Sequence, residues 1–193
     1  MTPNKIAVTG GLGSGKSAFC AVLRKMGFPV FSCDEINREL WTDEAYRHAL
    51  ADAFPDCLTN GAVDRTKLSA KVFSDERARD ALNALSHPQI MHRLIGRMEA
   101  CSGPVFAEVP LLYEGGYEGL FDAVIALHRD KEARIAAVKT RDGLSADQAL
   151  ARMRGQFDPE RLVQKRCLIV ENDGGLDALS EKAAEALRTL GIR

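Results

Sequence analysis

The sequence between Lys5 and Leu23, KIAVTGGLGSGKSAFCAVL, constrains the fold more than any other part of the chain. A short apolar run is followed by four glycines within six residues, and then by Lys16 and Ser17. Glycine weakens regular structure by about 0.5–1 kcal/mol, so such a cluster is expected where the backbone turns tightly or approaches something closely. The pattern predicts a strand, a tight loop and a helix in immediate succession.

The spacing of this segment, Gly-x-x-x-x-Gly-Lys-Ser, is that of a P-loop, in which backbone N–H groups surround the phosphates of a nucleotide. In such a loop Lys16 contacts the β- and γ-phosphates, and the Ser17 hydroxyl binds Mg²⁺. The alternative, a glycine-rich turn without a ligand, is disfavoured because strand and helix patterns flank the glycines on the correct sides. We therefore expect nucleotide to be bound by Gly11, Gly13, Ser14, Gly15, Lys16, Ser17 and Ala18.

The length and composition are those of one globular domain, with room for an inserted subdomain. Hydrophobic residues make up 46% of the 193 residues and charged residues 27%, which allows a sizeable core and excludes a disordered chain. The formal net charge of −1 provides no basic field, so nucleic acid is not expected as the main partner. No apolar run approaches the roughly 18 residues that span a bilayer, so no membrane partner is expected.

The five cysteines are widely spaced and contain no Cys-x-x-Cys pair. A disulfide framework or a structural zinc site is therefore not expected, and a reducing compartment is the natural one. The first residues enter a predicted strand directly, without a basic leader. We expect a cytoplasmic protein.

Short apolar segments that alternate with helical patterns define the fold class. Their apolar runs lack strict alternation, as expected when both faces of a parallel sheet are covered. This order of elements predicts an α/β domain with right-handed crossovers. The strands are expected at residues 5–9, 28–32, 104–109, 121–127 and 167–171.

Several helix boundaries can be predicted from capping residues. The first helix should end before Gly27, where a left-handed cap belongs. Ser145 and Gln148 form a capping box for a helix that runs to about Gln156. Further boundaries are expected at Asp158-Pro159, near Leu176 and before Gly191.

Residues 43–102 are the exception, because they show one helical pattern after another and no convincing strand. Asn60-Gly61 marks a turn, and Asp64 and Ser74 are candidate helix caps. Sixty residues are too many for an ordinary crossover. We expect a helical insertion into a single domain that spans residues 1–193.

A P-loop indicates a nucleoside triphosphate but not its use. The guanine-reading Asn-Lys-x-Asp and the switch Asp-x-x-Gly of GTPases do not occur, and ATPase motors need a longer chain. A small-molecule or nucleotide kinase is therefore favoured, and it requires a base and mobile arginines. An exposed helix face is the simpler interpretation for any one arginine, but the group is expected to include a catalytic one. The group consists of Arg129, Arg134, Arg141, Arg152, Arg154, Arg161 and Arg166.

Five segments in order resemble the dephospho-coenzyme A kinase family. They are TGGLGSGKS at 9–17, CDEINREL at 33–40, LSHPQI at 85–90, VPLLYE at 109–114 and ARMRGQ at 151–156. The first segment is shared by many P-loop proteins, whereas the set of five is specific and spans nearly the whole chain.

The resemblance implies that MgATP phosphorylates the ribose 3′-hydroxyl of dephospho-CoA, giving coenzyme A and ADP in the last step of coenzyme A synthesis. It also implies a five-stranded parallel core, a helical substrate-binding insertion at 43–102 and an arginine-rich lid at 138–166. The cofactors would be ATP and Mg²⁺ and the partner a small molecule. The sequence gives no oligomeric state.

Position along the chain suggests two further catalytic residues beside Lys16. Asp34 lies just past the second strand, where a carboxylate can act as the catalytic base. Arg141 ends the helix after the fourth strand and precedes Asp142-Gly143, a turn that could start the lid. The resemblance adds further roles, and by it Asn172 would lie at the nucleotide. The remaining assignments are Arg38, His87 and Glu114 to the substrate, and Ser17 and Glu108 to the metal.

The chain departs from the family pattern at four positions. Ala18 replaces a threonine, which leaves Ser17 as the hydroxyl beside Mg²⁺, and Cys33 replaces an aspartate, which leaves Asp34 as the one candidate base. Glu108 stands in place of an aspartate, and Cys167 does the same near the adenine loop.

Simpler alternatives remain for three of these residues and for the function. Asp34 could be only a helix N-cap, His87 a helix cap or a core histidine, and Glu114 a loop carboxylate. The chain could instead phosphorylate another small alcohol or nucleotide, or be a regulatory module that binds ATP without transferring phosphate.

Overall fold

The computed structural model describes residues 4–153 and 159–192 of the chain. The chain forms two compact units, which are described separately below. The first, here called the core unit, comprises Met1–Ser32 and Arg97–Arg193. The second, the helical unit, comprises Cys33–Gly96.

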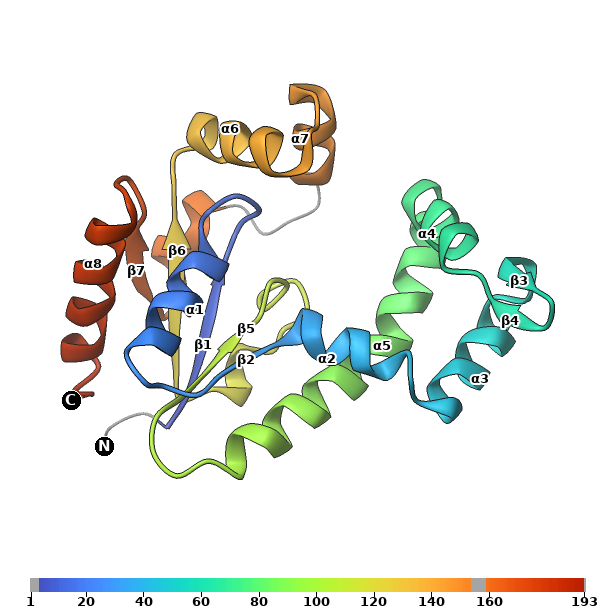
Figure 1. Cartoon of the computed structure of the whole chain (residues 1–193), viewed down its shortest axis with the longest axis horizontal. Helices are drawn as coiled ribbons and strands as arrows, with labels where there is room; N and C mark the ends of the chain where they lie inside the picture. Colours follow the sequence, from blue (N-terminus) through green and yellow to red (C-terminus); the bar gives the residue numbers. More distant parts are fainter. Residues whose placement is uncertain (1–3, 154–158, 193) are drawn as a thin grey trace. The chain divides into compact units, whose positions relative to one another are not determined.

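The core unit contains a five-stranded sheet in which all neighbouring strands are parallel (Figure 1). The order β2-β5-β1-β6-β7 places β1 in the centre. All five predicted strands are confirmed, as is the α/β fold class. Their bounds are Lys5–Gly10 for β1, Val30–Ser32 for β2, Val105–Glu108 for β5, Ala123–His128 for β6 and Leu168–Glu171 for β7.

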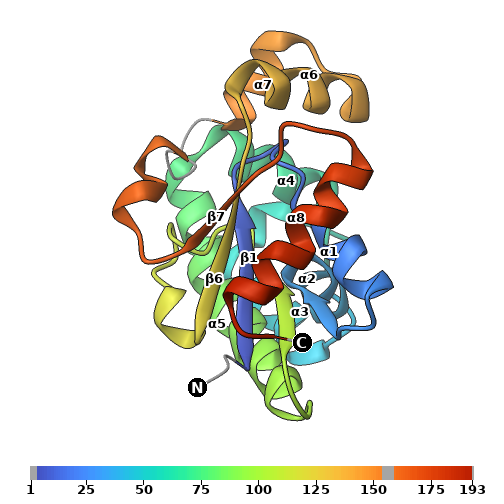
Figure 2. The same ribbon diagram turned by 90° about the vertical axis from the view of Figure 1, so that its left-hand side faces the viewer.

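Two helices, α1 (Lys16–Lys25) and α8 (Leu176–Thr189), pack side by side on one face of this sheet (Figures 1 and 2). Their buried residues form one apolar cluster with alternate residues of the strands, among them Phe19, Leu23, Leu179, Leu187, Ile6, Val8, Ile125 and Leu127. Because the intervening strand residues are buried as well, the strands are continuous apolar runs, as the sequence indicated.

The predicted end of α1 is confirmed. Gly27 has a φ of 91°, and the N–H of Phe28 donates to the carbonyl of Leu23 at 3.1 Å, which closes a left-handed cap. The end of α8 before Gly191 is confirmed as well.

Two further helices follow β6, namely α6 (Lys131–Asp142) and α7 (Ala146–Met153). The predicted capping box before α7 is confirmed, because Ser145 N donates to Gln148 Oε1 at 2.9 Å and Gln148 N donates to Ser145 Oγ at 3.2 Å. The predicted boundaries at Gln156 and Asp158, as well as Arg154, lie outside the described residues. A 3₁₀ segment, η3, covers Pro159–Gln164, and another, η2, covers Glu118–Leu120.

The helical unit contains a two-stranded antiparallel ladder, which the sequence analysis did not predict. Its strands, Leu58–Thr59 and Ala62–Val63, flank the predicted turn, where Asn60 and Gly61 both have positive φ values of 53° and 79°. Strands of two residues are too short to produce a periodic pattern. The other elements are α2 (Cys33–Leu40), α3 (Glu44–Ala53), η1 (Pro55–Cys57), α4 (Arg65–Ser74) and α5 (Glu76–Glu99).

One predicted cap in this unit is confirmed and one is wrong. Asp64 caps α4, accepting hydrogen bonds from the N–H groups of Thr66 and Lys67. The cap of α5 is Asp75 rather than Ser74, because the Asp75 carboxylate accepts from the N–H groups at 77 and 78, whereas the Ser74 hydroxyl donates back to Ala70. Aspartate accepts such bonds without competing donor chemistry, and it stands one residue closer to the helix.

The helical unit extends beyond the predicted insertion at its start, because α2 belongs to it. It begins at Cys33 and ends at Gly96, whereas the sequence pattern placed the insertion at 43–102. Tyr46 and Ser86 share a buried hydrogen bond of 2.8 Å, which links α3 to α5.

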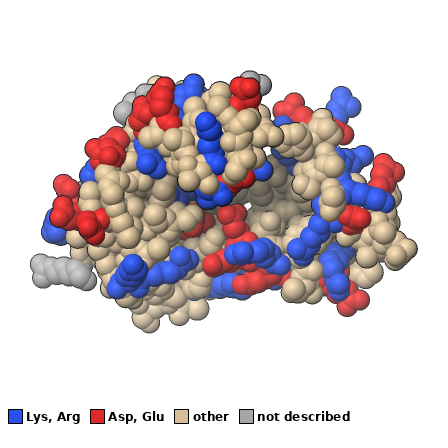
Figure 3. Space-filling model, turned by 45° about the horizontal axis from the view of Figure 1, so that its top comes forward, with Lys and Arg blue, Asp and Glu red and all other residues tan. Residues whose placement is uncertain are grey.

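The surface carries both signs of charge. Figure 3 shows Lys and Arg mixed with Asp and Glu across the face in view, and no extended basic surface among the described residues of that face. No helix in the described part of the chain is long and apolar enough to cross a bilayer.

Candidate active site

The predicted P-loop connects the carboxyl end of β1 to the start of α1. Gly15 occupies the N-cap position with a φ of 95°, no described side chain caps the helix, and its first turn holds no acidic residue. The first N–H groups of α1 and the positive end of its dipole are therefore available to an anion. This is the geometry of a phosphate site.

Three of the loop glycines have backbone conformations that other residues rarely adopt. The φ values are 140° at Gly10, 81° at Gly13 and 95° at Gly15. Space is also missing at Gly15, because a Cβ atom there would lie 2.1 Å from Nδ2 of Asn172. The glycines that the sequence singled out are thus required by the backbone and by its neighbours.

Lys16 folds back over this loop. Its Nζ donates to the carbonyl of Gly10 at 2.7 Å and to that of Gly11 at 3.1 Å. The ammonium group therefore lies within the loop curve that the motif assigns to the phosphates.

Ser17 and Glu108 lie together at the carboxyl edge of the sheet. Glu108 ends β5, is 8% exposed, and accepts a hydrogen bond of 2.7 Å at Oε1 from Ser17 Oγ. A hydroxyl and a carboxylate are the hard oxygen ligands that Mg²⁺ prefers, and that ion needs few protein ligands because water and phosphate complete its shell. Ala18 is exposed and adds no oxygen. No group of three or more His, Cys, Asp or Glu in the described residues could hold a metal.

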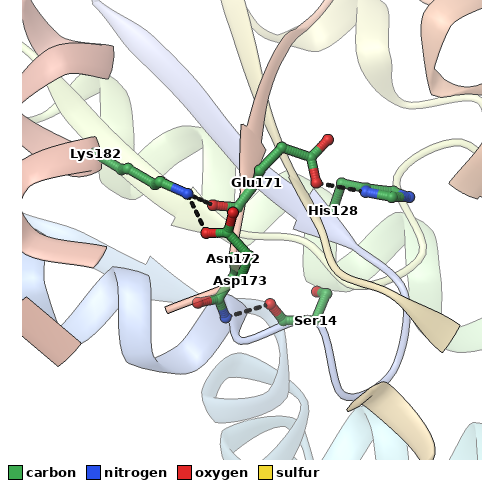
Figure 4. Close-up of polar contacts among 6 residues, drawn as sticks. All are labelled: Ser14, His128, Glu171, Asn172, Asp173 and Lys182. Carbon is green, nitrogen blue, oxygen red and sulfur yellow. Dashed lines mark hydrogen bonds and ion pairs between the residues drawn. The ribbon is translucent and has the colours of Figure 1, made fainter. Parts of the chain in front are cut away.

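Asn172 links the end of β7 to the P-loop (Figure 4). Its side chain is buried, and Nδ2 donates to the carbonyl of Ser14 at 2.8 Å. Its backbone N–H donates to the backbone carbonyl of His128 at 2.7 Å. Lys182 of α8 holds the same segment, donating to the carbonyl of Glu171 and to the carboxylate of Asp173. The predicted nucleotide residue Asn172 thus shapes the loop itself.

Glu114 lies beside the P-loop glycines. It is exposed, and it lines a small pocket together with Gly10 and Gly11. The remaining lining residues are Thr9, Pro110, Tyr113 and Leu162. The pocket gives Glu114 a position next to the phosphate site.

Arg141, the predicted catalytic arginine, lies at the far end of α6 from this loop. Its Nε and Nη2 donate to the two carboxylate oxygens of Asp142 at 2.7 and 3.0 Å, and Arg152 of α7 donates to the same group at 3.0 Å. The hydrogen bonds from Arg141, with the charge of Arg152, lower the pKa of the Asp142 carboxyl. In this structure Arg141 faces an aspartate and not the P-loop.

Arg134, one turn into α6, contacts the P-loop instead. It is 7% exposed, and its Nε donates to the carbonyl of Leu12 at 3.0 Å. The sequence analysis grouped it with six other arginines and gave it no role of its own. The sequence could have placed Arg134 in the first turn of a helix, because Asp130 is the N-cap that begins α6 directly after β6. That β6 neighbours β1, and so brings this turn to the P-loop, comes only from the strand order of the structure.

The helical unit holds Asp34, Arg38 and His87. Asp34 and Arg38 are exposed residues of α2. Asp34 is the second residue of α2 and so lies inside the helix, and no hydrogen bond joins its carboxylate to a described N–H of that helix. The alternative of a simple N-cap is therefore wrong. His87 lies inside α5, just before Pro88, where half-burial lowers its pKa; it is therefore not a helix cap.

Comparison with known proteins gives one consistent family. The family model described as dephospho-CoA kinase matches residues 4–178. A dephospho-CoA kinase of Thermus thermophilus is 36% identical, and the match covers 96% of this chain and 90% of that protein. One of Deinococcus radiodurans is 34% identical, with 98% and 94% covered.

Solved structures agree with the fold. A Thermus thermophilus protein superposes with a TM-score of 0.85 at 34% identity, covering 98% of both chains. A dephospho-CoA kinase from Campylobacter jejuni superposes with a TM-score of 0.64 at 24% identity, covering 97% of both chains, which supports the fold alone.

Proposed function

This chain belongs to the dephospho-CoA kinase family, and we propose that it transfers the γ-phosphoryl group of ATP to the ribose 3′-hydroxyl of dephospho-CoA. The observation that carries the proposal is the P-loop, with Lys16 and the Ser17–Glu108 pair at one edge of the sheet. Phosphoryl transfer depends mainly on positioning and on charge stabilisation, which is what this edge supplies.

In the proposed complex the loop N–H groups and the start of α1 bind the phosphates. The Lys16 ammonium would leave the carbonyls of Gly10 and Gly11 for β- and γ-phosphate oxygens. Asn172 would keep the carbonyl of Ser14 directed away from the nucleotide.

Ser17 and Glu108 would hold Mg²⁺, Ser17 through its hydroxyl and Glu108 directly or through a bound water. When bound, the ion neutralises charge on the phosphate oxygens. The Ser17–Glu108 hydrogen bond already places both oxygens together.

Asp34 is the proposed general base. It would accept the proton of the acceptor hydroxyl as that oxygen attacks the γ-phosphorus and the bond to the leaving ADP oxygen breaks. Its place along the chain supports this role. Asp34 follows Ser32, the last residue of β2, with only Cys33 between them. Ser32 is in turn the residue of β2 that pairs with Glu108 of β5.

The remaining assignments concern the acceptor and the lid. Arg38, His87 and Glu114 would contact dephospho-CoA, residues 43–102 would form most of its binding region, and Arg141 would reach the transferring phosphoryl from a lid at 138–166. We also propose a cytoplasmic location, since five free thiols are typical of a reducing compartment.

The test is an assay of ADP release from MgATP with dephospho-CoA, pantetheine, adenosine, shikimate or no acceptor. Of these acceptors, we expect only dephospho-CoA to cause rapid release of ADP. The product should be coenzyme A by mass spectrometry, and ³¹P NMR should show a 3′-phosphate. Faster turnover of another acceptor would identify a different small-molecule kinase. ATP binding without transfer to any acceptor would identify a regulatory module.

A further inference from the structure

We propose that Arg134 is a positioning residue of the P-loop, which orients the N–H of Gly13 for phosphate binding. The inference deepens the proposed function but does not depend on the acceptor. It rests on where the carbonyl groups of the loop are directed.

A loop that offers N–H groups to a phosphate must direct its carbonyls elsewhere, and each buried carbonyl needs a donor. Side chains supply two of these donors. Asn172 donates to the carbonyl of Ser14 at 2.8 Å, and Arg134 Nε donates to that of Leu12 at 3.0 Å. The donors to Leu12 and Ser14 come from outside the motif, from α6 and from the end of β7.

Peptide planarity converts these bonds into orientations of N–H groups. None of the described peptide bonds is cis, and in a trans peptide the N–H points opposite to the preceding C=O. A Leu12 carbonyl held by Arg134 therefore directs the N–H of Gly13 away from the guanidinium. Asn172 fixes the N–H of Gly15 through Ser14 in the same way.

The packing around Arg134 shows how closely it fits the loop. A Cβ on Gly11 would lie 2.4 Å from Nη2 of Arg134, and one on Gly13 would lie 2.6 Å from its backbone carbonyl oxygen. The φ of Gly11 is not positive, so its backbone conformation does not require glycine. The guanidinium of Arg134 is what leaves no room there for a side chain. The first turn of α6 and the loop are thus built against each other.

Arg134 belongs to a capped first turn of α6. Its backbone N–H donates to the carbonyl of Asp130 at 2.9 Å, and the Asp130 carboxylate caps the same turn by accepting from the N–H groups of Glu132 and Ala133. A guanidinium stays protonated at any physiological pH, so the donor to the Leu12 carbonyl is always charged. The side chain therefore supplies a hydrogen bond from a charged donor on an ordered helical turn.

The first experiment measures binding of MgADP and of adenosine to Arg134→Met by calorimetry. Losing a hydrogen bond from a charged donor should weaken MgADP binding about tenfold, whereas adenosine, which has no phosphate, should bind as to wild type. Lys131→Met, at an exposed lysine of the same helix that lies outside the proposed lid, is the matched control and should change neither affinity. In the kinase assay Arg134→Met should raise KM for ATP more than it lowers kcat.

Arg134→Lys separates charge from geometry. A lysine keeps the charge but cannot reproduce the guanidinium fork, so we expect only partial recovery of MgADP affinity. Full recovery would reduce Arg134 to a charge and overturn the positioning role.

Gly11→Ala disturbs the same contact from the loop side, and it provides the test if Arg134→Met does not fold. It should weaken MgADP but not adenosine, and the loss should be smaller when Arg134 has been replaced by lysine, whose end is more flexible. Unchanged MgADP affinity in folded Arg134→Met, or an equal loss for adenosine, would contradict the proposal. If wild type binds MgADP but does not phosphorylate dephospho-CoA, the proposed function fails while these binding results still decide the role of Arg134.

Discussion

The P-loop is held by side chains from other strands and helices, whereas the residues assigned in the helical unit lie mostly on helix surfaces. Glu108, Asn172 and Arg134 are at most 8% exposed, and each bonds to the loop or to the first turn of α1. Asp34 and Arg38 are exposed on α2. The phosphate site of the core unit is therefore built from buried side chains that bond to the loop, whereas the helical unit presents exposed groups.

This difference predicts that changes in the two regions affect different steps. Changes at the loop should weaken both nucleotide binding and turnover, and changes in the helical unit should affect transfer while ATP affinity remains. Four substitutions, from the largest expected effect to the smallest, test this division.

Asp34→Asn should have the largest effect. Asparagine has a similar shape but cannot take the proton, so transfer to dephospho-CoA should fall roughly 10²–10⁴-fold. ATP affinity and melting temperature should stay near wild type. Glu35→Gln, the exposed neighbour on α2, is the control, and wild-type transfer by Asp34→Asn would show that another group is the base.

Lys16→Ala tests the loop. Removing a positioned charge from the β- and γ-phosphates should lower turnover about 10²–10³-fold and weaken ATP binding, without unfolding the protein. Lys25→Ala, at the other end of α1, should do neither. Near-normal turnover in folded Lys16→Ala is incompatible with a nucleotide-binding P-loop.

Arg141→Lys should have an intermediate effect. Arg141 makes a two-pronged contact with Asp142, and we expect it to make the same kind of contact with phosphate oxygens. A lysine cannot make that contact, so turnover should fall about tenfold. The measurement is turnover at saturating ATP and dephospho-CoA, with Arg152→Lys as the control because Arg152 donates to the same carboxylate. A loss below about twofold would place Arg141 among the surface residues.

The fold of the core unit could be predicted because its signals are local. Apolar runs marked the five strands, and the glycine spacing marked the loop between β1 and α1. The capping box of Ser145 and Gln148 and the turn at Asn60-Gly61 depend on residues close together in the chain, so they were also predictable.

The contacts that shape the site could not be predicted in the same way. Arg134 meets Leu12 across 122 positions of the chain, and Asn172 meets Ser14 across 158. Such pairs follow from strand order, which places β6 next to β1 and β7 next to β6, and strand order cannot be predicted from local periodicity. Arg141 was chosen for its place before the Asp142-Gly143 turn, and its bond to Asp142 depends on side-chain geometry.

The smallest effect concerns stability in the helical unit, where Asp64 caps α4. Its carboxylate accepts from the N–H groups of Thr66 and Lys67 and from the Thr59 hydroxyl, and these bonds, that from Lys67 first, lower its pKa from 3.8. A lowered folded pKa stabilises the fold above the unfolded pKa, and this contribution is lost as the pH falls through the folded value.

Asp64→Asn keeps a capping oxygen but does not titrate, so its cost should depend on pH. We expect the melting temperature to fall by about 2 °C at pH 7. The gap to wild type should close as the pH falls below about 4, the pKa of an unfolded aspartate, and through the lowered pKa of the folded state. The single tryptophan reports on this region, because Arg65, the first residue of α4, stacks on the Trp41 ring at 4.3 Å. Fluorescence melts should therefore show the closing gap, while Asp52→Asn, on an exposed position of α3, should show none. A gap that stays constant with pH would mean that the charge of Asp64 contributes nothing to the cap.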